Sequence, residues 1–283
     1  MPYRALVVAP FVAILASFWP GSVTATPLLY APSANHILYT IDPTTGLSTA
    51  LGFITPDIPT DALRINALSF VPSGILYGVD DNNNVYQIDP TTVPCAPFTC
   101  NHATLIGNTG LGSSNLVIAL ESSSGGTLYA SSGSGDLETI NRSTGAATVV
   151  GNTGFIPAGD LAFSPDGRTL YMSAGGVGPS DLVTVNQATG AGSLVGAIGF
   201  SDIFGLEFDQ GILYGLNDNG QLIRIDPATG AGALIAVTSP LVEGLDLALP
   251  FSVVPEPSSL LLLGAGLAGI AMLGARQRRR FMR

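Results

Sequence analysis

The sequence predicts an all-β fold, a five-bladed β-propeller closed by a C-terminal strand, with an N-terminal signal peptide and a C-terminal transmembrane helix. Two observations predict the body: a unit of short strands occurs five times, and a lone strand follows the last copy. A third, the apolar segments at both ends of the chain, predicts the two flanking elements. A period of about 40–50 residues made of short strands is the size of one propeller blade. An open solenoid of stacked hairpins is the alternative architecture.

Each copy of the unit contains a Leu-Tyr pair and, further along, an apolar residue followed by Asp or Asn. The Tyr residues are spaced by 47, 52, 42 and 43 residues. They are Tyr30, Tyr77, Tyr129, Tyr171 and Tyr214. Before the Asp or Asn, polar and apolar positions alternate with the period of two that is typical of a strand. Turn sequences such as Asp218-Asn219-Gly220 and Asp226-Pro-Ala-Thr-Gly230 separate the strands and favour tight reversals.

The unit is interpreted as four strands. The first is a short apolar pair such as Leu206-Glu-Phe208, the second carries the Leu-Tyr pair, the third ends at the Asp or Asn, and the fourth ends near a Val-Gly or similar step. The first copy begins at Leu28 and lacks a first strand, whereas Leu245 to Leu249 resembles a first strand on its own. If this segment completes the first blade, the two ends of the body are joined and no sheet edge is left at the closure.

Composition limits the partners of the body. The 283 residues are 46% apolar, which is enough for one sizeable core, and 35 Gly and 20 Pro suit a turn-rich β protein. The chain contains no Lys, and residues 26–254 hold 19 Asp and Glu against four Arg, a net charge of 4 − 19 = −15. Such a surface repels nucleic acid, so we expect no nucleic-acid partner.

The two cysteines, Cys95 and Cys100, lie close together on a Pro-rich insertion between the third and fourth strands of the second copy. In an exported protein such a pair is predicted to form a local disulfide. The alternatives are a redox pair or, with His102, part of a metal site. The spacing is not Cys-x-x-Cys and a second ligand pair is lacking, which favours the disulfide.

The ends of the chain predict export and a membrane anchor. Residues 1–25 have a basic Arg4, an apolar run and small residues before a cleavage point after Ala25, as secretory signals do. The body is assigned to residues 26–250 and a linker to 251–257. Residues 258–275 are 18 uncharged residues, within the roughly 17–25 that span a bilayer, and the basic residues 276–283 are expected to stay in the cytoplasm. A plain C-terminal anchor without a sorting function is the alternative interpretation of this end.

The C-terminal end resembles the PEP-CTERM sorting signal, which consists of a Pro-Glu-Pro motif, a short helix rich in Leu, Gly and Ala, and an Arg-rich tail in that order. The resemblance covers about the last 30 residues, with Pro255, Glu256 and Pro257 as the sorting motif. The stop signal that it implies is Arg276, Arg278, Arg279 and Arg280. It implies processing by a membrane enzyme of the exosortase type, location in the cell envelope or at the surface, and association with exopolysaccharide or a biofilm matrix.

The body resembles the blades of lactonase-type and quinoprotein-type propellers, because of the Leu-Tyr and Asp-Pro-x-Thr-Gly steps and Phe163-Ser-Pro-Asp-Gly167. These motifs mark turns and support the fold only. His36 and His102 have no repeated partner, so no catalytic triad is predicted.

Two functions follow for the body. The first is an exported, non-enzymatic module that binds polysaccharide or matrix and needs no cofactor. The second is a calcium-dependent propeller hydrolase of the lactonase or phytase type. The acidic turn with Asp80 and Asp81 is the candidate Ca²⁺ site, although it lacks the Asp-x-Asp-x-Asp-Gly spacing. The hydrolase requires several carboxylates from different blades to converge on the central channel, whereas the acidic residues recur at turn positions, which favours the binding module.

Overall fold

The computed structural model describes residues 27–56, 62–175, 178–242 and 245–250. These residues form twenty β-strands, and none of them forms a helix. Within this part of the chain there is accordingly no helix with the length and apolar character to span a membrane. The predicted signal peptide, the Pro-Glu-Pro motif, the transmembrane segment and the Arg-rich tail all lie outside the described residues.

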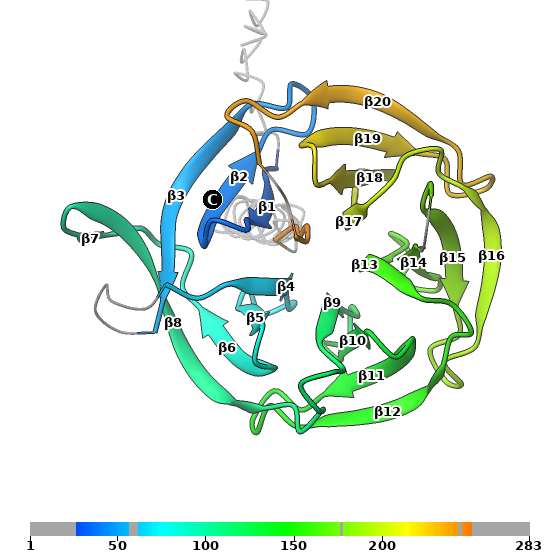
Figure 1. Ribbon diagram of the computed structural model, residues 1–283, viewed down its shortest axis with the longest axis horizontal. Helices are drawn as coiled ribbons and strands as arrows, with labels where there is room; N and C mark the ends of the chain where they lie inside the picture. The colour runs from blue at the N-terminus through cyan, green and yellow to red at the C-terminus, as the bar shows by residue number, and fades with distance from the viewer. Residues whose placement is uncertain (1–26, 57–61, 176–177, 243–244, 251–283) are drawn as a thin grey trace, which may run out of the picture.

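The strands form one eight-stranded sheet and three four-stranded sheets, which are arranged around a ring (Figure 1). We divide them into five groups in chain order. Group 1 contains β1 (Leu29–Pro32), β2 (Ile37–Ile41) and β3 (Ser48–Thr55). Group 2 contains β4 (Ile65–Phe70), β5 (Leu76–Asp80), β6 (Asn84–Ile88) and β8 (Phe98–Asn108), with the short β7 (Val93–Cys95) beside β8.

The three remaining groups each form a separate antiparallel sheet. Group 3 contains β9 (Val117–Ser122), β10 (Leu128–Ser132), β11 (Asp136–Ile140) and β12 (Ala147–Asn152). Group 4 contains β13 (Pro157–Phe163), β14 (Leu170–Ala174), β15 (Asp181–Val185) and β16 (Gly192–Ala197). Group 5 contains β17 (Ile203–Asp209), β18 (Ile212–Asn217), β19 (Gln221–Ile225) and β20 (Gly232–Val237).

The end of the body lies beside its beginning, as the sequence predicts. The backbone N–H of Tyr30 donates to the carbonyl of Ala248 at 2.8 Å, and the N–H of Ala248 donates back to Tyr30 at 2.9 Å. The contact is an isolated antiparallel bridge rather than a full strand. At the outer side, the N–H of Ser48 donates to the carbonyl of Ser239 at 3.0 Å. Group 1 is therefore held by two segments that follow β20, the one at Ser239 and the one at Ala248.

The Gly residues that end several fourth strands are explained by contacts between groups. A Cβ added to Gly151 in group 3 would lie 2.1 Å from the carbonyl oxygen of Thr189 in the Thr-Gly turn of group 4. A Cβ on Gly196 in group 4 would lie 2.2 Å from the oxygen of Thr229 in group 5. Because only Gly permits this approach, each fourth strand packs directly on the turn of the next group.

The cysteine insertion is more ordered than the loop that the sequence predicts. Cys95 and Cys100 form a disulfide, and β7 pairs with the start of β8 as a hairpin. β8 continues past this hairpin and pairs in parallel with β3, with Phe53 opposite Cys100. The second copy lacks the Thr-Gly turn, and the cysteine hairpin takes the place of that turn beside group 1. The pairing of β3 with β8 joins groups 1 and 2 into one eight-stranded sheet.

Apolar clusters fill the spaces between neighbouring groups. The Tyr of the Leu-Tyr pair has a repeated partner there, a Phe at the end of the next group's first strand. Tyr30 meets Phe70 at a ring-centroid distance of 5.1 Å. Tyr129 meets Phe163, and Tyr171 meets Phe208, each at 5.7 Å. The repeat thus places one aromatic pair between groups wherever both residues are present, and aromatic pairs of this kind stabilise such interfaces.

Candidate functional site at the ring axis and at the turns

The strands nearest the centre of the ring are β4, β9, β13, β17 and residues 245–250, which we call the inner strands (Figure 1). Their residues align by the Tyr that they face on the second strand. Ser69, Glu121, Ala162, Glu207 and Ala248 share one position. Ala67, Ala119, Asp160, Gly205 and Asp246 lie two residues earlier. Four carboxyls thus come from four different inner strands, and we call Glu121, Asp160, Glu207 and Asp246 the axial carboxyls.

The axial carboxyls bind the backbone of neighbouring inner strands. An inner strand is a sheet edge, so alternate N–H groups on it have no strand partner. Glu121 accepts the N–H of Phe163 at 3.1 Å, and Glu207 accepts that of Leu249 at 3.0 Å. Asp246 accepts the N–H of Leu68 at 2.8 Å. Each of these carboxyls therefore joins its own inner strand to that of the next group.

Asp160 makes the widest set of contacts. Its Oδ2 accepts the N–H of Leu206 in group 5 at 2.6 Å and that of Leu247 in the closing segment at 3.3 Å. Its carboxyl also hydrogen-bonds to the carboxyl of Asp246. Asp246 and Leu247 are both on the segment that closes the ring. The side chain of Asp160 therefore joins group 4 to group 5 and to this closing segment.

All four axial carboxyls are buried, with exposed fractions of 9% for Glu121, 8% for Glu207 and 0% for the two Asp side chains. Burial raises the pKa of Glu121 to about 7, although its hydrogen bonds oppose the rise. Burial likewise raises the pKa values of Asp160, Glu207 and Asp246 well above their ordinary range, and the nearby carboxyls contribute to the rise. The cluster therefore holds protons at a pH at which exposed carboxyls have lost them.

The axial carboxyls correct the expectation that acidic residues recur at turns and form no cluster of their own. A charged residue between two apolar ones, as in Leu206-Glu-Phe208, reads as solvent-facing in a single strand. The burial of Glu121 and Glu207 could have been identified by aligning the copies, because the other copies have Ser69, Ala162 and Ala248 at this position. Small residues at one position in most copies indicate close approach of backbones rather than solvent.

In the part of the chain with described structure, no group of three or more His, Cys, Asp or Glu side chains is placed to hold a metal ion. The oxygens of the axial carboxyls accept backbone N–H groups instead, and a bound cation would compete with these contacts.

The acidic turn with Asp80 and Asp81, the candidate calcium site, forms a hairpin turn in the structure. The Oδ1 of Asp80 accepts the N–H groups of Asn82 at 2.9 Å and Asn84 at 2.8 Å, and its Oδ2 accepts the hydroxyl of Tyr86 at 3.2 Å. Asn217 makes the equivalent pair of backbone contacts in group 5. Asp81 is exposed and accepts only from the side chain of Asn82 among the contacts seen. Asp80 therefore shapes a hairpin turn, as an amide does at the same position elsewhere.

A further buried carboxyl, Glu138, lies on β11 at the position that Tyr86, Val183 and Ile223 hold in other groups. Ser132 donates its hydroxyl to Oε1, whereas Oε2 has no hydrogen-bond partner among the described residues. Burial raises the pKa of Glu138 to about 7. The signal in the sequence that marks this position as buried is the comparison between copies, because the aligned residues are aromatic or aliphatic.

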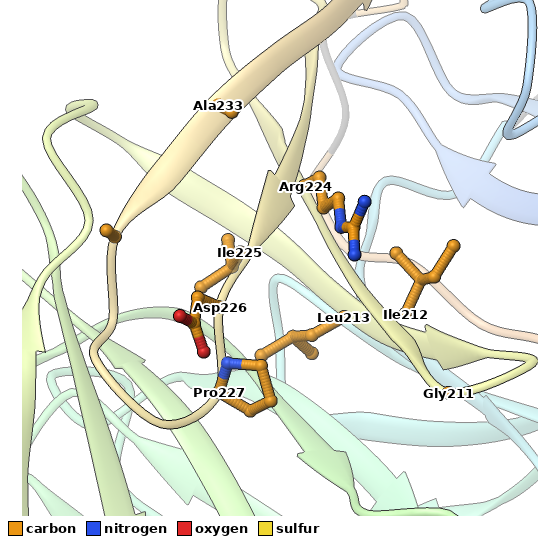
Figure 2. A pocket seen from close by; sticks show the side chains of 9 residues that line it. Gly211, Ile212, Leu213, Arg224, Ile225, Asp226, Pro227 and Ala233 are labelled. Atoms are coloured by element: carbon orange, nitrogen blue, oxygen red, sulfur yellow. The ribbon is translucent and has the colours of Figure 1, made fainter.

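Two hollows occur at the same place in different groups. The one in group 5 has a volume of about 500 Å³ and lies between the β17–β18 turn and the end of β19 (Figure 2). Arg224 and Ile212 lie beside one another in it, and Asp226 and Pro227 border it at the turn after β19. The hollow in group 2 has a volume of about 410 Å³. Its lining residues are Gly74, Gln87, Ile88, Asp89, Pro90, His102 and Thr104.

Residues 253–280, which begin three residues after the described part of the body ends, match the family model of the PEP-CTERM protein-sorting motif. The chain carries a PEP-CTERM motif. This motif implies that the protein is exported and that an exosortase processes it. The match includes Pro255, Glu256 and Pro257 and the Arg residues from Arg276 to Arg280, all of them outside the described residues.

Comparison with solved structures identifies the fold of the body that precedes the PEP-CTERM motif. A chain of a nidogen/laminin complex aligns with a TM-score of 0.50 and 12% identity, over 80% of this chain and 98% of that one. A putative 6-phosphogluconolactonase from Bacteroides uniformis aligns with a TM-score of 0.43 and 16% identity, over 77% and 72% of the two chains. The likeness to the first of these shows that the body is β-propeller-like. No curated protein matches the sequence.

Proposed function

We propose that the protein is a five-bladed, non-enzymatic propeller that the PEP-CTERM motif delivers to the cell envelope or surface. There it acts as a binding or structural module associated with exopolysaccharide or the extracellular matrix. Each strand group is one blade, and residues 245–250 supply the inner strand of the first. Before processing, residues 258–275 anchor the chain in the membrane, and the body is released or retained at the surface afterwards.

The observation that carries the proposal is the matched sorting motif directly after the segment that closes the ring. The axial carboxyls support a structural role, because their hydrogen bonds join inner strands to one another. The net charge of −15 over residues 26–254 favours solubility outside the cell and partners that are not polyanions.

The test replaces Pro255, Glu256 and Pro257 together by Ala in the full chain, expressed in a host with an exosortase. The proposal predicts that the wild-type protein loses its C-terminal tail, which a mass measurement detects, and that the variant keeps the tail and stays with the membrane. A matched control replaces Pro240 and Pro250, which lie outside the motif. Equal processing of wild type and triple variant would contradict recognition of the motif.

The calcium-dependent hydrolase remains the alternative, and the convergence of four carboxyls from four inner strands is the observation that favours it. Calcium would have to displace the backbone N–H contacts of at least some axial carboxyls. Adding calcium chloride to metal-free protein tests this, since a ligand of the native state raises its melting temperature. A rise that disappears in the Asp160→Asn variant would move the proposal to the hydrolase.

A further inference from the structure

The two hollows are built from equivalent residues of the repeat. Both include a Gly at the turn between the first and second strands, Gly74 in group 2 and Gly211 in group 5. Both include an exposed long polar side chain on the third strand, Gln87 or Arg224. Both end at an Asp-Pro step, which is Asp89-Pro90 in one and Asp226-Pro227 in the other.

In groups 3 and 4 a side chain occupies the corresponding space. The residue after the third-strand Asn is Arg142 in group 3 and Gln187 in group 4, where groups 2 and 5 have Pro. The Arg142 guanidinium covers the turn Gly, because a Cβ on Gly126 would lie 3.5 Å from its Nη2. The Nε2 of Gln187 donates to the carbonyl of Arg168, which holds the turn position in group 4, at 3.1 Å. Among groups 2 to 5, this repeat position therefore holds Pro beside the two hollows and a long side chain where the turn is covered.

We propose that the hollows of groups 2 and 5 are two equivalent subsites for neutral saccharide rings. This proposal rests on the proposed function and locates its polysaccharide binding in these two hollows. Their volumes, about 500 and 410 Å³, are within the range of about 300–1,000 Å³ of small-molecule sites.

The lining has the chemistry that a sugar ring requires. The Pro ring and the adjacent Ile, Ile225 or Ile88, supply an apolar surface for C–H groups. The carboxylate of Asp226 accepts the N–H of Ala228 at 2.9 Å and hydrogen bonds from Thr229, and that of Asp89 accepts the N–H of Thr91 at 2.8 Å and a hydrogen bond from the Thr91 side chain. A carboxylate has about four acceptor positions, so each retains capacity for a ligand hydroxyl.

The donors and the charge of the body narrow the ligand further. Arg224 in one hollow and Gln87 in the other present planar groups with several N–H donors to ring hydroxyls. At this position one hollow has the cation Arg224 and the other has the neutral Gln87, so a positive charge is not common to both sites. Because the body also carries a net charge of −15, a neutral saccharide fits both sites, whereas a polyanion does not. Two subsites on one ring also strengthen attachment to a repeating polymer through avidity.

The test titrates the purified full chain with neutral gluco-, manno- and galacto-trisaccharides and with a uronic acid trisaccharide, using calorimetry. Pro90→Gln and Pro227→Gln copy the filled turn of group 4, which shows that the turn accommodates Gln. We expect two sites in the wild type for at least one neutral trisaccharide, one site in each single variant, and at least tenfold weaker binding in the double variant. Asp218→Ala, an exposed residue that lines neither hollow, is the control and leaves binding unchanged.

The outcomes separate the two claims. Unchanged neutral-saccharide binding in a folded double variant, verified by its melting temperature, would overturn the assignment of the hollows while leaving a saccharide-binding function in place. Absence of binding to every neutral trisaccharide in the wild type would overturn the subsites and the polysaccharide part of the proposed function, but not the sorting. Preference for the uronic acid trisaccharide would overturn the neutral class.

Discussion

The carboxyl of Asp160 on β13 hydrogen-bonds to the carboxyl of Asp246 on the closing segment. Burial raises the pKa values of both carboxyls well above their ordinary range, and two carboxyl oxygens can hydrogen-bond to each other only when at least one of the carboxyls is protonated. Both side chains are completely buried. A shared proton between residues 86 positions apart in the sequence thus holds the end of the body to its fourth group.

Replacing Asp246 tests the strength of this contact. Asp246→Asn keeps a donor toward Asp160 and an acceptor for the N–H of Leu68, so we expect an unfolding free energy within about 1 kcal/mol of the wild type. Asp246→Ala removes the acceptor of the Leu68 N–H and the carboxyl partner of Asp160, both in the buried interior, and is expected to cost about 3 kcal/mol or more. Urea unfolding of the two variants measures this, with exposed Asp218→Ala as control. An Ala variant as stable as the wild type would refute the structural role of the pair.

The axial carboxyls predict that the fold is less stable at higher pH. The pKa of Glu121 is about 7 in the folded protein against an ordinary 4.5, so its contribution is fully present below about pH 4.5 and is lost as the pH rises through about 7. Asp160, Glu207 and Asp246, whose pKa values are also raised, act in the same direction. One such group changes the unfolding free energy by at most about 1.4 kcal/mol per pH unit.

Glu121→Gln removes one of these ionisations, and we expect a shallower loss of unfolding free energy between pH 4.5 and 7 than in the wild type. Asp226→Asn is the control, because hydrogen bonds at its turn lower the pKa of the exposed Asp226 below its ordinary 3.8, so this substitution leaves the slope between pH 4.5 and 7 unchanged. Urea unfolding at a series of pH values measures both slopes. The same slope in the wild type and in Glu121→Gln would show that Glu121 is not protonated in the folded state.

Glu138 predicts a stabilising substitution. Group 4 has Val183 and Ala174 where group 3 has Glu138 and Ser132. Glu138→Val with Ser132→Ala copies that apolar pair and removes a buried carboxyl with one unpartnered oxygen. We expect the double variant to be about 1–2 kcal/mol more stable at pH 8, since buried ionisable groups often destabilise relative to apolar ones. Thermal unfolding measures this, and Glu138→Gln separates loss of charge from loss of shape.

Local sequence patterns were enough to predict the repeated strands and turns, because Asp226-Pro-Ala-Thr-Gly230 and its counterparts act through their own backbone. The Gly of this turn has a φ of 81°, which Gly adopts without strain. The pairing of Tyr30 with Ala248 was also predictable, since the first copy lacks one strand and the last segment supplies one.

Long-range contacts could not be predicted from any single strand. The parallel pairing of β3 with β8 depends on the cysteine hairpin reaching across from group 2. The axial carboxyls depend on which strand edge faces the ring axis, and the hollows depend on whether Pro90 or Gln187 follows the third strand. The axial carboxyls and the hollows can both be recognised in the sequence only when equivalent positions of the five copies are compared.

The central claim is that residues 245–250 close the ring, and hydrogen exchange of their amides tests it most directly. The N–H groups of Leu247, Ala248 and Leu249 donate to Asp160, Tyr30 and Glu207 respectively. The account predicts that a peptide covering these residues exchanges as slowly as a peptide from β17. Exchange at the rate of an unprotected chain, with β17 still protected, would show an open stack of strands and contradict the closure.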